Sequence, residues 1–221
     1  MPREQFHRGL REVEDGVLEL GSMVDRQLER AMRALMERDL PLADAVTRDD
    51  GEVNRTRFHL DNMCISLLAQ QAPMASDLRL IVAVLAMVSD LERMGDHAEG
   101  IARIVLLMHD EPLVKPLADL PEMAIVGRRM LKGALDAFVD RSVEGAYLVG
   151  RADDEVDAIY DRVYRELVSI MGADPSTIEA CTHLLWVAHN LERIADRTTN
   201  IAERVVYTVT GMLPEMDVSR Y

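Results

Sequence analysis

Apolar side chains recur at steps of three and four residues along most of the chain, the spacing that places them on one face of an α-helix. The first such run is the clearest, and it comprises Phe6, Leu10, Val13, Val17, Leu20, Val24, Leu28, Ala31 and Leu35. Asp39 and Pro41 then mark a stop and a restart. The pattern predicts a second helix over about 40–70, ended by Ala72-Pro73, and a third over about 75–109.

Residues 109–121 contain prolines at positions 112, 116 and 121, which a helix interior does not tolerate. The pattern after them predicts three more helices, near 122–140, 143–171 and 176–211. Gly172 is expected to end the fifth helix, and Asp174-Pro175 to open the sixth as N-cap and first-turn pair. No stretch shows the alternation of a half-buried strand. The predicted fold class is therefore all-α, with two tandem antiparallel three-helix bundles, 1–109 and 122–221, joined by a Pro-rich linker at 110–121.

The two predicted bundles are related by an internal sequence repeat. Residues 90–96 read Asp-Leu-Glu-Arg-Met-Gly-Asp and residues 190–196 read Asn-Leu-Glu-Arg-Ile-Ala-Asp, an offset of 100. Upstream the offset is 103, and it aligns Ala34, Arg38, Arg48, Asp50, Glu52, Val53 and Asn54 with Ala137, Arg141, Arg151, Asp153, Glu155, Val156 and Asp157. With only two long copies, the repeat indicates a tandem domain and not a solenoid.

In each copy an apolar stripe turns acidic half way along a helix. Ile81, Leu85 and Val88 lie in line with Glu92, Asp96 and Glu99, and the sixth helix continues Cys181, Leu185 and Ala188 into Glu192, Asp196 and Thr199. Carboxylates four residues apart on a helix repel by about 0.2–0.5 kcal/mol, and on a packed face they need a counter-charge. The second and fifth helices offer facing pairs, Asp50 with Asn54 and Asp153 with Asp157, which Asp61 and Asp161 would extend.

We therefore predict two metal sites, with Asp50, Asn54, Glu92 and Asp96 in the first bundle and Asp153, Asp157, Glu192 and Asp196 in the second. Oxygen ligands favour hard ions, and zinc also accepts carboxylates, so iron, manganese or zinc is expected, with room for more than one ion per bundle. Arg93 and Arg193 are expected to brace the carboxylates or pair between helices, with phosphate binding as the open alternative. Arg79 is a weaker candidate for docking a partner, and the six His residues show no ligand spacing.

The amino-acid composition narrows the range of molecules that the protein is expected to bind. The 25 basic and 39 acidic residues give a net charge of −14, which disfavours nucleic acid and anionic lipid and favours cations or basic protein surfaces. Cys64 and Cys181 have no Cys-x-x-Cys partner, as expected of reduced thiols in the cytoplasm. The longest apolar run, 80–88, is far shorter than the ~20 residues of a membrane span, and the N-terminus has no apolar signal core. We expect a cytoplasmic protein without membrane insertion.

The run Ala-Ser-Asp-Leu-Arg-Leu at 75–80, together with the motifs at 90–96 and 190–196, resembles the PhoU family over essentially the whole chain. The resemblance implies a negative regulator of phosphate uptake, which restrains the phosphate ABC transporter and its sensor kinase when phosphate is plentiful. It implies a cytoplasmic homo-oligomer, such as a dimer, and multinuclear iron or zinc clusters on the acidic motifs. Glu92, Asp96, Glu192 and Asp196 match that motif, Asp50, Asp153 and Asp157 fit the facing positions, and Asn54 departs from its acidic mate.

The acidic motifs are also compatible with other functions. A solvated acidic face, paired with Arg93 and Arg193, would need no metal. A di-iron oxidase would need Glu-x-x-His on two helices, and the only such spacing, Glu4 to His7, has no twin. A metal-free adaptor whose acidic faces bind a basic partner is the main alternative. No Ser-His-Asp set, phosphate loop or reactive-Cys pattern is visible, so the sequence does not indicate an enzyme.

Overall fold

The computed structural model describes residues 2–71, 73–108, 114 and 118–216. Its helices are α1 (Pro2–Glu37), α2 (Leu40–Gln71), α3 (Ser76–Leu107), α4 (Asp119–Asp140), α5 (Val143–Ala173) and α6 (Ile178–Thr210), with a 3-10 turn, η1 (Pro175–Thr177), before α6. Within the described residues all regular structure is helical, which confirms the predicted fold class. No helix in that part of the chain combines the length and apolarity that a membrane crossing requires.

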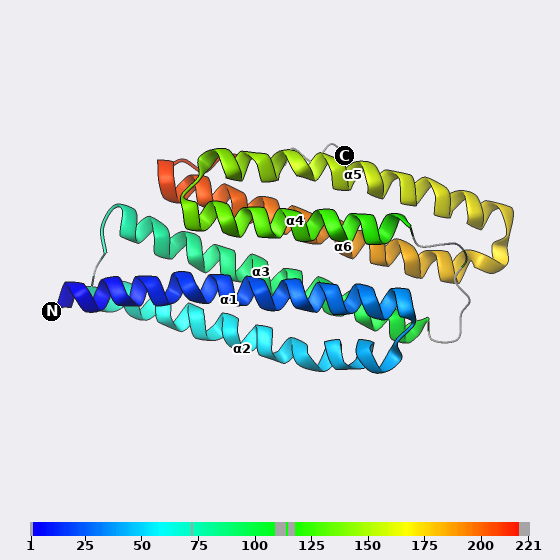
Figure 1. The fold of residues 1–221 in the computed structure, drawn as a ribbon, viewed down its shortest axis with the longest axis horizontal. Helices are drawn as coiled ribbons and strands as arrows, with labels where there is room; N and C mark the ends of the chain where they lie inside the picture. The colour runs from blue at the N-terminus through cyan, green and yellow to red at the C-terminus, as the bar shows by residue number, and fades with distance from the viewer. Residues whose placement is uncertain (1, 72, 109–113, 115–117, 217–221) are drawn as a thin grey trace.

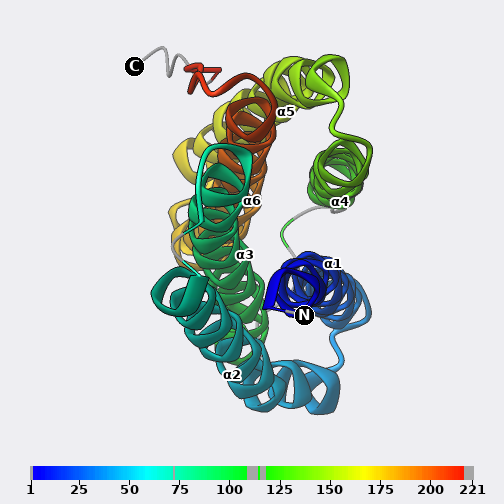
Figure 2. The ribbon, with the colours of Figure 1, turned by 90° about the vertical axis from the view of Figure 1, so that its left-hand side faces the viewer.

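The helices run side by side along the long axis of the molecule, with α1–α3 in one half and α4–α6 in the other (Figure 1). Viewed end on, α2, α3, α6 and α5 trace an arc, and α1 and α4 lie on its inner side (Figure 2). The two central helices of the arc, α3 and α6, pack directly on each other. One continuous apolar core therefore runs through both bundles, with Leu20, Met94 and Leu131 among its fully buried side chains.

The first turn of each bundle repeats in its backbone geometry. Arg38 and Arg141, which the offset of 103 aligns, both adopt the left-handed conformation, with φ of 56° and 53°. In each case the next residue donates its N–H back to an alanine carbonyl: Asp39 to Ala34 at 3.0 Å, and Ser142 to Ala137 at 2.9 Å. This is the six-to-one hydrogen bond of a Schellman helix end. The internal repeat therefore extends to the turn that sets the antiparallel geometry.

The fourth helix begins at Asp119, three residues before its predicted start, and so includes Pro121. A proline is tolerated in the first turn because the first N–H groups of a helix have no intrahelical partner. Pro112 and Pro116 of the predicted linker lie outside the described residues. Gly172 does not end α5, which continues to Ala173. Asp174 caps η1 rather than α6 directly, since its Oδ1 accepts the Ser176 N–H at 3.0 Å.

The contact between α3 and α6 is symmetric at the level of the repeat. Asp90 Oδ1 accepts a hydrogen bond from Arg197 Nη1 at 3.4 Å, and Asn190 Oδ1 lies 2.9 Å from His97 Nδ1. The offset of 100 exchanges the two pairs, matching Asp90 with Asn190 and His97 with Arg197. Burial raises the pKa of Asp90 and lowers that of His97. The two bundles thus meet as the halves of a two-fold dimer would, with diverged residues on each side.

A second symmetric contact joins α1 to α4. Arg128 donates two hydrogen bonds to Asp25, at 2.6 and 2.8 Å, and these residues are repeat mates at the offset of 103. Glu29 lies 3.4 Å from the same guanidinium, and Arg141 pairs with Glu14 nearer the other end of α1. A two-pronged arginine–carboxylate pair has fixed geometry. The inner helices of the two bundles are therefore joined by ion pairs as well as by apolar packing, such as that of Leu135 on Gly21.

We predict that a double-mutant cycle of Asp25→Ala and Arg128→Ala gives a coupling of about 0.5–1 kcal/mol toward stability, because the pair is two-pronged and only about one third exposed. The measurement is urea unfolding of the four proteins. The Lys132–Asp136 pair on α4, with an N–O distance of 3.6 Å and both side chains over 60% exposed, is the control and should show no coupling. Equal couplings in the two cycles would contradict this account.

Candidate metal sites

The first candidate site is organised around the carboxylate of Asp50 on α2. Asp50 is buried, and each of its oxygens accepts a hydrogen bond from an amide. Gln27 on α1 donates from Nε2 to Oδ1 at 2.9 Å, and Asn54 donates from Nδ2 to Oδ2 at 2.8 Å. The predicted ligands Asp50 and Asn54 are thus in contact with each other. Gln27 was not predicted, since it lies on α1 and no local spacing links it to α2.

Gly95 allows α3 to approach this group closely. A Cβ atom at Gly95 would lie 3.0 Å from Val53 Cγ1, 3.2 Å from Gln27 Oε1 and 3.6 Å from Asp50 Oδ1. The first two contacts are tighter than ordinary packing, so a side chain at this position would have to displace Val53 and Gln27 by a few tenths of an ångström. Gly95 lies between Glu92 and Asp96 in the chain. The acidic motif of α3 therefore faces the Gln27–Asp50 pair.

The carboxylates of Glu92 and Asp96 are electrostatically coupled to Asp50. The pKa of Glu92 is raised by burial first, then by the charges of Asp96 and Asp50. Burial and then the charge of Asp50 raise the pKa of Asp96. Arg93 compensates them only loosely, since it is 60% exposed and lies 3.9 Å from Glu92 and 3.4 Å from Asp96. The charge of Arg57 also lowers the pKa of Glu92, but the pKa remains raised. The first site is therefore a group of coupled carboxylates whose charge is only partly offset by the nearby arginines.

The second candidate site has stronger internal compensation. Arg193 lies 2.9 Å from Glu192 Oε2 through Nε and 2.9 Å from Asp196 Oδ2 through Nη1. His189 Nδ1 lies 3.4 Å from Glu192, although its sequence position had suggested no ligand role. Glu192 is buried, with only 5% of its surface exposed. The arginine that follows each motif glutamate thus braces the acids much more closely here than in the first bundle.

The facing helix of the second bundle contributes differently from its mate. Asp153, like Asp50, is buried, whereas Asp157 is exposed on α5. Met130 replaces Gln27 at the matching position of α4 and is buried. Tyr160 stands where the first repeat has Arg57, and its pKa is raised by burial and then by Glu192. The two sites share their acidic motif but differ in the surrounding residues.

The remaining sequence candidates pair with arginines of their own helices. Asp161 is exposed and pairs with Arg165 at 3.0 Å, and Asp61 pairs with Arg57 at 3.0 Å. Glu99 accepts from Arg103 at 2.8 Å. Among the described residues, no three His, Cys, Asp or Glu side chains are gathered tightly enough to hold one ion. Ligation at either site therefore requires the amide oxygens or a local rearrangement of the carboxylates.

Arg79, the candidate for docking a partner, lies near the start of α3 beside the end of α6. Its side chain comes within 3.7 Å of the position that a Cβ on Gly211 would take. Gly211 ends α6 with a left-handed φ of 79° and donates its N–H to Tyr207. A cation beside the C-terminus of a helix is favourable because the last carbonyls carry partial negative charge. Arg79 thus stabilises the end of α6.

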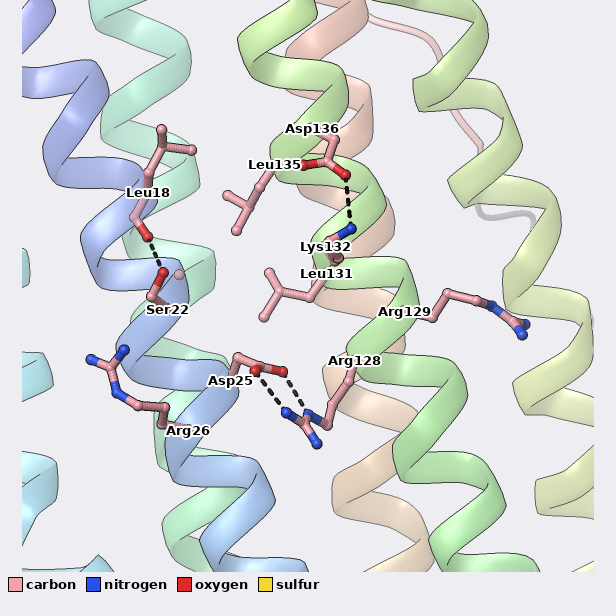
Figure 3. Close-up of a pocket in the computed structure, with 11 residues that line it drawn as sticks. Leu18, Ser22, Asp25, Arg26, Arg128, Arg129, Leu131, Lys132, Leu135 and Asp136 are labelled. Atoms are coloured by element: carbon pink, nitrogen blue, oxygen red, sulfur yellow. Dashed lines mark hydrogen bonds and ion pairs between the residues drawn. The ribbon is translucent and has the colours of Figure 1, made fainter.

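A cleft of about 600 Å³ lies between α1 and α4 on the inner side of the arc (Figure 3). The Asp25–Arg128 pair spans it, and Leu18, Leu131 and Leu135 line it. Figure 3 shows that Arg26 and Arg129 point away from the cleft in opposite directions. The cations that border the cleft therefore do not converge on one anion, and the acidic groups of α3 and α6 are the stronger candidate sites.

The fold and the duplicated motif together define a class of protein: two tandem three-helix bundles, each with an acidic pair on a packed helix face. The chain belongs to the PhoU family, because the model described as PhoU domain matches residues 17–105 and again residues 120–205. This confirms the resemblance seen in the motifs.

Relatives and solved structures agree with this assignment. A phosphate-specific transport system accessory protein PhoU homolog of Clostridium acetobutylicum is 37% identical over 96% of this chain and 97% of its own length. The homolog of Rhizobium meliloti is also 37% identical, over 95% of this chain and 89% of its own. The crystal structure of PhoU from Pseudomonas aeruginosa has a TM-score of 0.90 at 35% identity and covers 94% of this chain and all of that one. The crystal structure of the phosphate transport system regulatory protein PhoU from Streptococcus pneumoniae has a TM-score of 0.89 at 33% identity. It covers 95% of this chain and 99% of that one.

We predict opposite stability effects for the two motif glutamates in chelator-treated protein. Because the pKa of Glu92 is raised on folding, the folded state holds its proton more tightly, and stability falls as pH rises above about 4. Glu92→Gln should therefore stabilise the protein at pH 7, by about 0.2–0.5 kcal/mol, and the gain should vanish near pH 3.

The matched variant, Glu192→Gln, should instead destabilise the protein at pH 7, by about 1 kcal/mol, since it replaces the ion pair with Arg193 by a hydrogen bond to a neutral amide. Thermal unfolding at several pH values measures both effects. Glu52→Gln, at an exposed acid on α2, is the control and should change nothing. If both substitutions changed the stability in the same direction, the two glutamates would not differ in how well nearby positive charge compensates them.

Proposed function

We propose that this chain is an accessory protein of a phosphate-specific transport system that restrains phosphate uptake and starvation signalling when phosphate is plentiful. The single observation that carries the proposal is its similarity, over nearly the full length, to relatives named as phosphate-specific transport system accessory proteins. In this proposal the chain acts in the cytoplasm by binding the transporter's ATPase and the phosphate sensor kinase. It works through protein contacts as a homo-oligomer, with a dimer as the simplest form, and not through catalysis.

We further propose that the acidic motifs bind metal. The first site offers carboxylates from Asp50, Glu92 and Asp96, with amide oxygens available from Asn54 and Gln27. Gln27 Oε1 is buried without a hydrogen-bond partner, and an orphaned oxygen beside under-compensated carboxylates suits a hard cation. Iron, manganese or zinc bound there would supply the missing positive charge. The second site would use Asp153, Asp157, Glu192 and Asp196.

A metal-free adaptor is the second candidate, and one observation favours it. Arg193 already pairs with Glu192 and Asp196 at 2.9 Å, so the second acidic group is compensated without an ion. In that case the acidic faces would bind a basic protein surface directly. Elemental analysis of gently purified protein separates the two candidates, because only the first requires stoichiometric metal.

The regulatory proposal predicts the phenotype of a gene deletion. Cells that lack this protein should keep the phosphate-starvation response switched on in phosphate-rich medium, because the restraint on the sensor kinase is gone. A starvation-responsive reporter, measured in high and low phosphate, provides the readout, and re-expression of the wild-type chain is the control. A deletion strain whose starvation response is still switched off in phosphate-rich medium would contradict the regulatory assignment, whatever the metal content of the protein.

The metal proposal predicts a ranking of the two sites. The second site offers four carboxylates, whereas the first offers three and neutral amides, and each carboxylate strengthens the attraction for a cation. In this proposal a bound ion displaces Arg193 from Glu192 and Asp196, so the number of carboxylates sets the ranking. Asp196→Ala should therefore release more metal than Asp96→Ala. Metal content of the two purified variants, by elemental analysis, decides the ranking. Equal or reversed losses would show that carboxylate number does not set affinity, and metal-free wild-type protein with no thermal shift on adding iron, manganese or zinc would defeat the sites altogether.

A further inference from the structure

Gln27 is a buried polar residue within the apolar seam of α1. It is only 4% exposed, and its neighbours on the same helix, Val24 and Leu28, belong to the core. Only half of its amide is satisfied, because Nε2 donates to Asp50 while Oε1 has no hydrogen-bond partner. Leaving a buried acceptor unpaired costs about 1–3 kcal/mol. This cost calls for an explanation at a position where an apolar side chain would pack without it.

The orphaned oxygen faces the acidic motif of α3. The point where a Cβ on Gly95 would lie is 3.2 Å from Gln27 Oε1 and 3.6 Å from Asp50 Oδ1. These two oxygens therefore meet α3 at Gly95, the residue that precedes Asp96 and follows Glu92 by three positions. Gly95 contributes only hydrogen at this point, so no side chain of its own separates the amide from the motif.

The second repeat shows that the bundle does not require an amide here. Met130, at the matching position of α4, is 1% exposed and packs in the core. The acidic motif beside it is retained as Glu192 and Asp196 and is braced by Arg193 at 2.9 Å. An amide is thus present in the copy whose arginine, Arg93, is loosely placed. The first site therefore combines carboxylates whose charge is only partly offset with a buried amide oxygen that has no hydrogen-bond partner.

We propose that Gln27 is a ligand of the cation at the first site, through Oε1, and that it makes the two repeat sites unlike in ion preference. The inference rests on the proposed metal binding of the acidic motifs. The Nε2 group of Gln27 holds Asp50 in place while its oxygen completes a donor set of carboxylates and amides from three helices, α1, α2 and α3. Such a set selects hard ions such as Mn²⁺.

The test uses Mn²⁺ as the probe and the Asp196→Ala protein as the parent, so that the first site is read alone. Calorimetry gives the dissociation constant, and the Mn²⁺ electron paramagnetic resonance spectrum reports the ligand environment. Gln27→Met, which installs the residue of the second repeat, should weaken Mn²⁺ binding at least tenfold and change the spectrum. Met130→Gln, the reciprocal change on α4, should leave both readouts unaltered.

Gln27→Glu separates ligation from mere positioning of Asp50. Glutamate keeps an oxygen for the cation but cannot donate to Asp50, so a ligand role predicts binding at least as tight as in the parent. A positioning role predicts that Gln27→Glu is as weak as Gln27→Met, and that result would overturn the inference. Binding of Mn²⁺ to Gln27→Met with the parent's affinity would also overturn it. Gln27→Leu serves as a second apolar variant, and thermal unfolding of each apo protein confirms that it is folded.

The controls distinguish failure of this inference from failure of the metal proposal. A parent that binds Mn²⁺ and loses it on Asp96→Ala establishes the first site independently of Gln27. A parent that binds no Mn²⁺ would overturn the first site itself, and the assignment of Gln27 with it. The regulatory role proposed for the chain is read from the deletion phenotype and is independent of either result.

Discussion

The structure depends on one electrostatic constraint: carboxylates lie on helix faces that are otherwise packed. Glu92 and Asp96 continue an apolar stripe of α3, and Glu192 and Asp196 continue the corresponding stripe of α6. A carboxylate in such a place is stable only if a positive charge or hydrogen-bond donors reach it. The neighbouring helices are arranged to supply these groups, and the differences between the two bundles are largely differences in how they do so.

In the second bundle an arginine pairs with the carboxylates, whereas in the first bundle amide groups donate hydrogen bonds to one of them. Arg193 closes on both acids of its motif at 2.9 Å, whereas Arg93 stays mostly exposed. In the first bundle the amides of Gln27 and Asn54 donate to Asp50 and leave Glu92 and Asp96 with raised pKa values. An ion pair satisfies the acids permanently, while amides can present either hydrogen or oxygen. The repeat thus contains one acidic group that is paired closely with an arginine and one that relies on amide donors and a more exposed arginine.

The helical pattern of the sequence was sufficient for the fold, because the apolar spacing, the turn residues and the repeat all indicate the same elements. The end of the predicted linker was wrong because Pro121 was taken as a helix breaker, although a first-turn proline breaks no hydrogen bond. The acidic stripes were found because an i,i+4 spacing is local. Gln27 and His189 were missed because their roles depend on which helices pack together. Asp157 is exposed although its spacing from Asp153 equals that of Asn54 from Asp50, since burial depends on the facing helix.

The acidic motifs and the contact between the bundles lie on the same turns of α3 and α6. Asp90, which receives Arg197 from the opposite bundle, precedes Glu92 by two residues, and His97, which meets Asn190, directly follows Asp96. Any change in the charge balance of one motif therefore acts on a helix that also holds the two halves together. Coupling between distant parts of a protein requires an element whose arrangement both parts bias. Here the acidic motifs and the inter-bundle contacts share the same turns of α3 and α6, so these two helices are where such coupling would have to act.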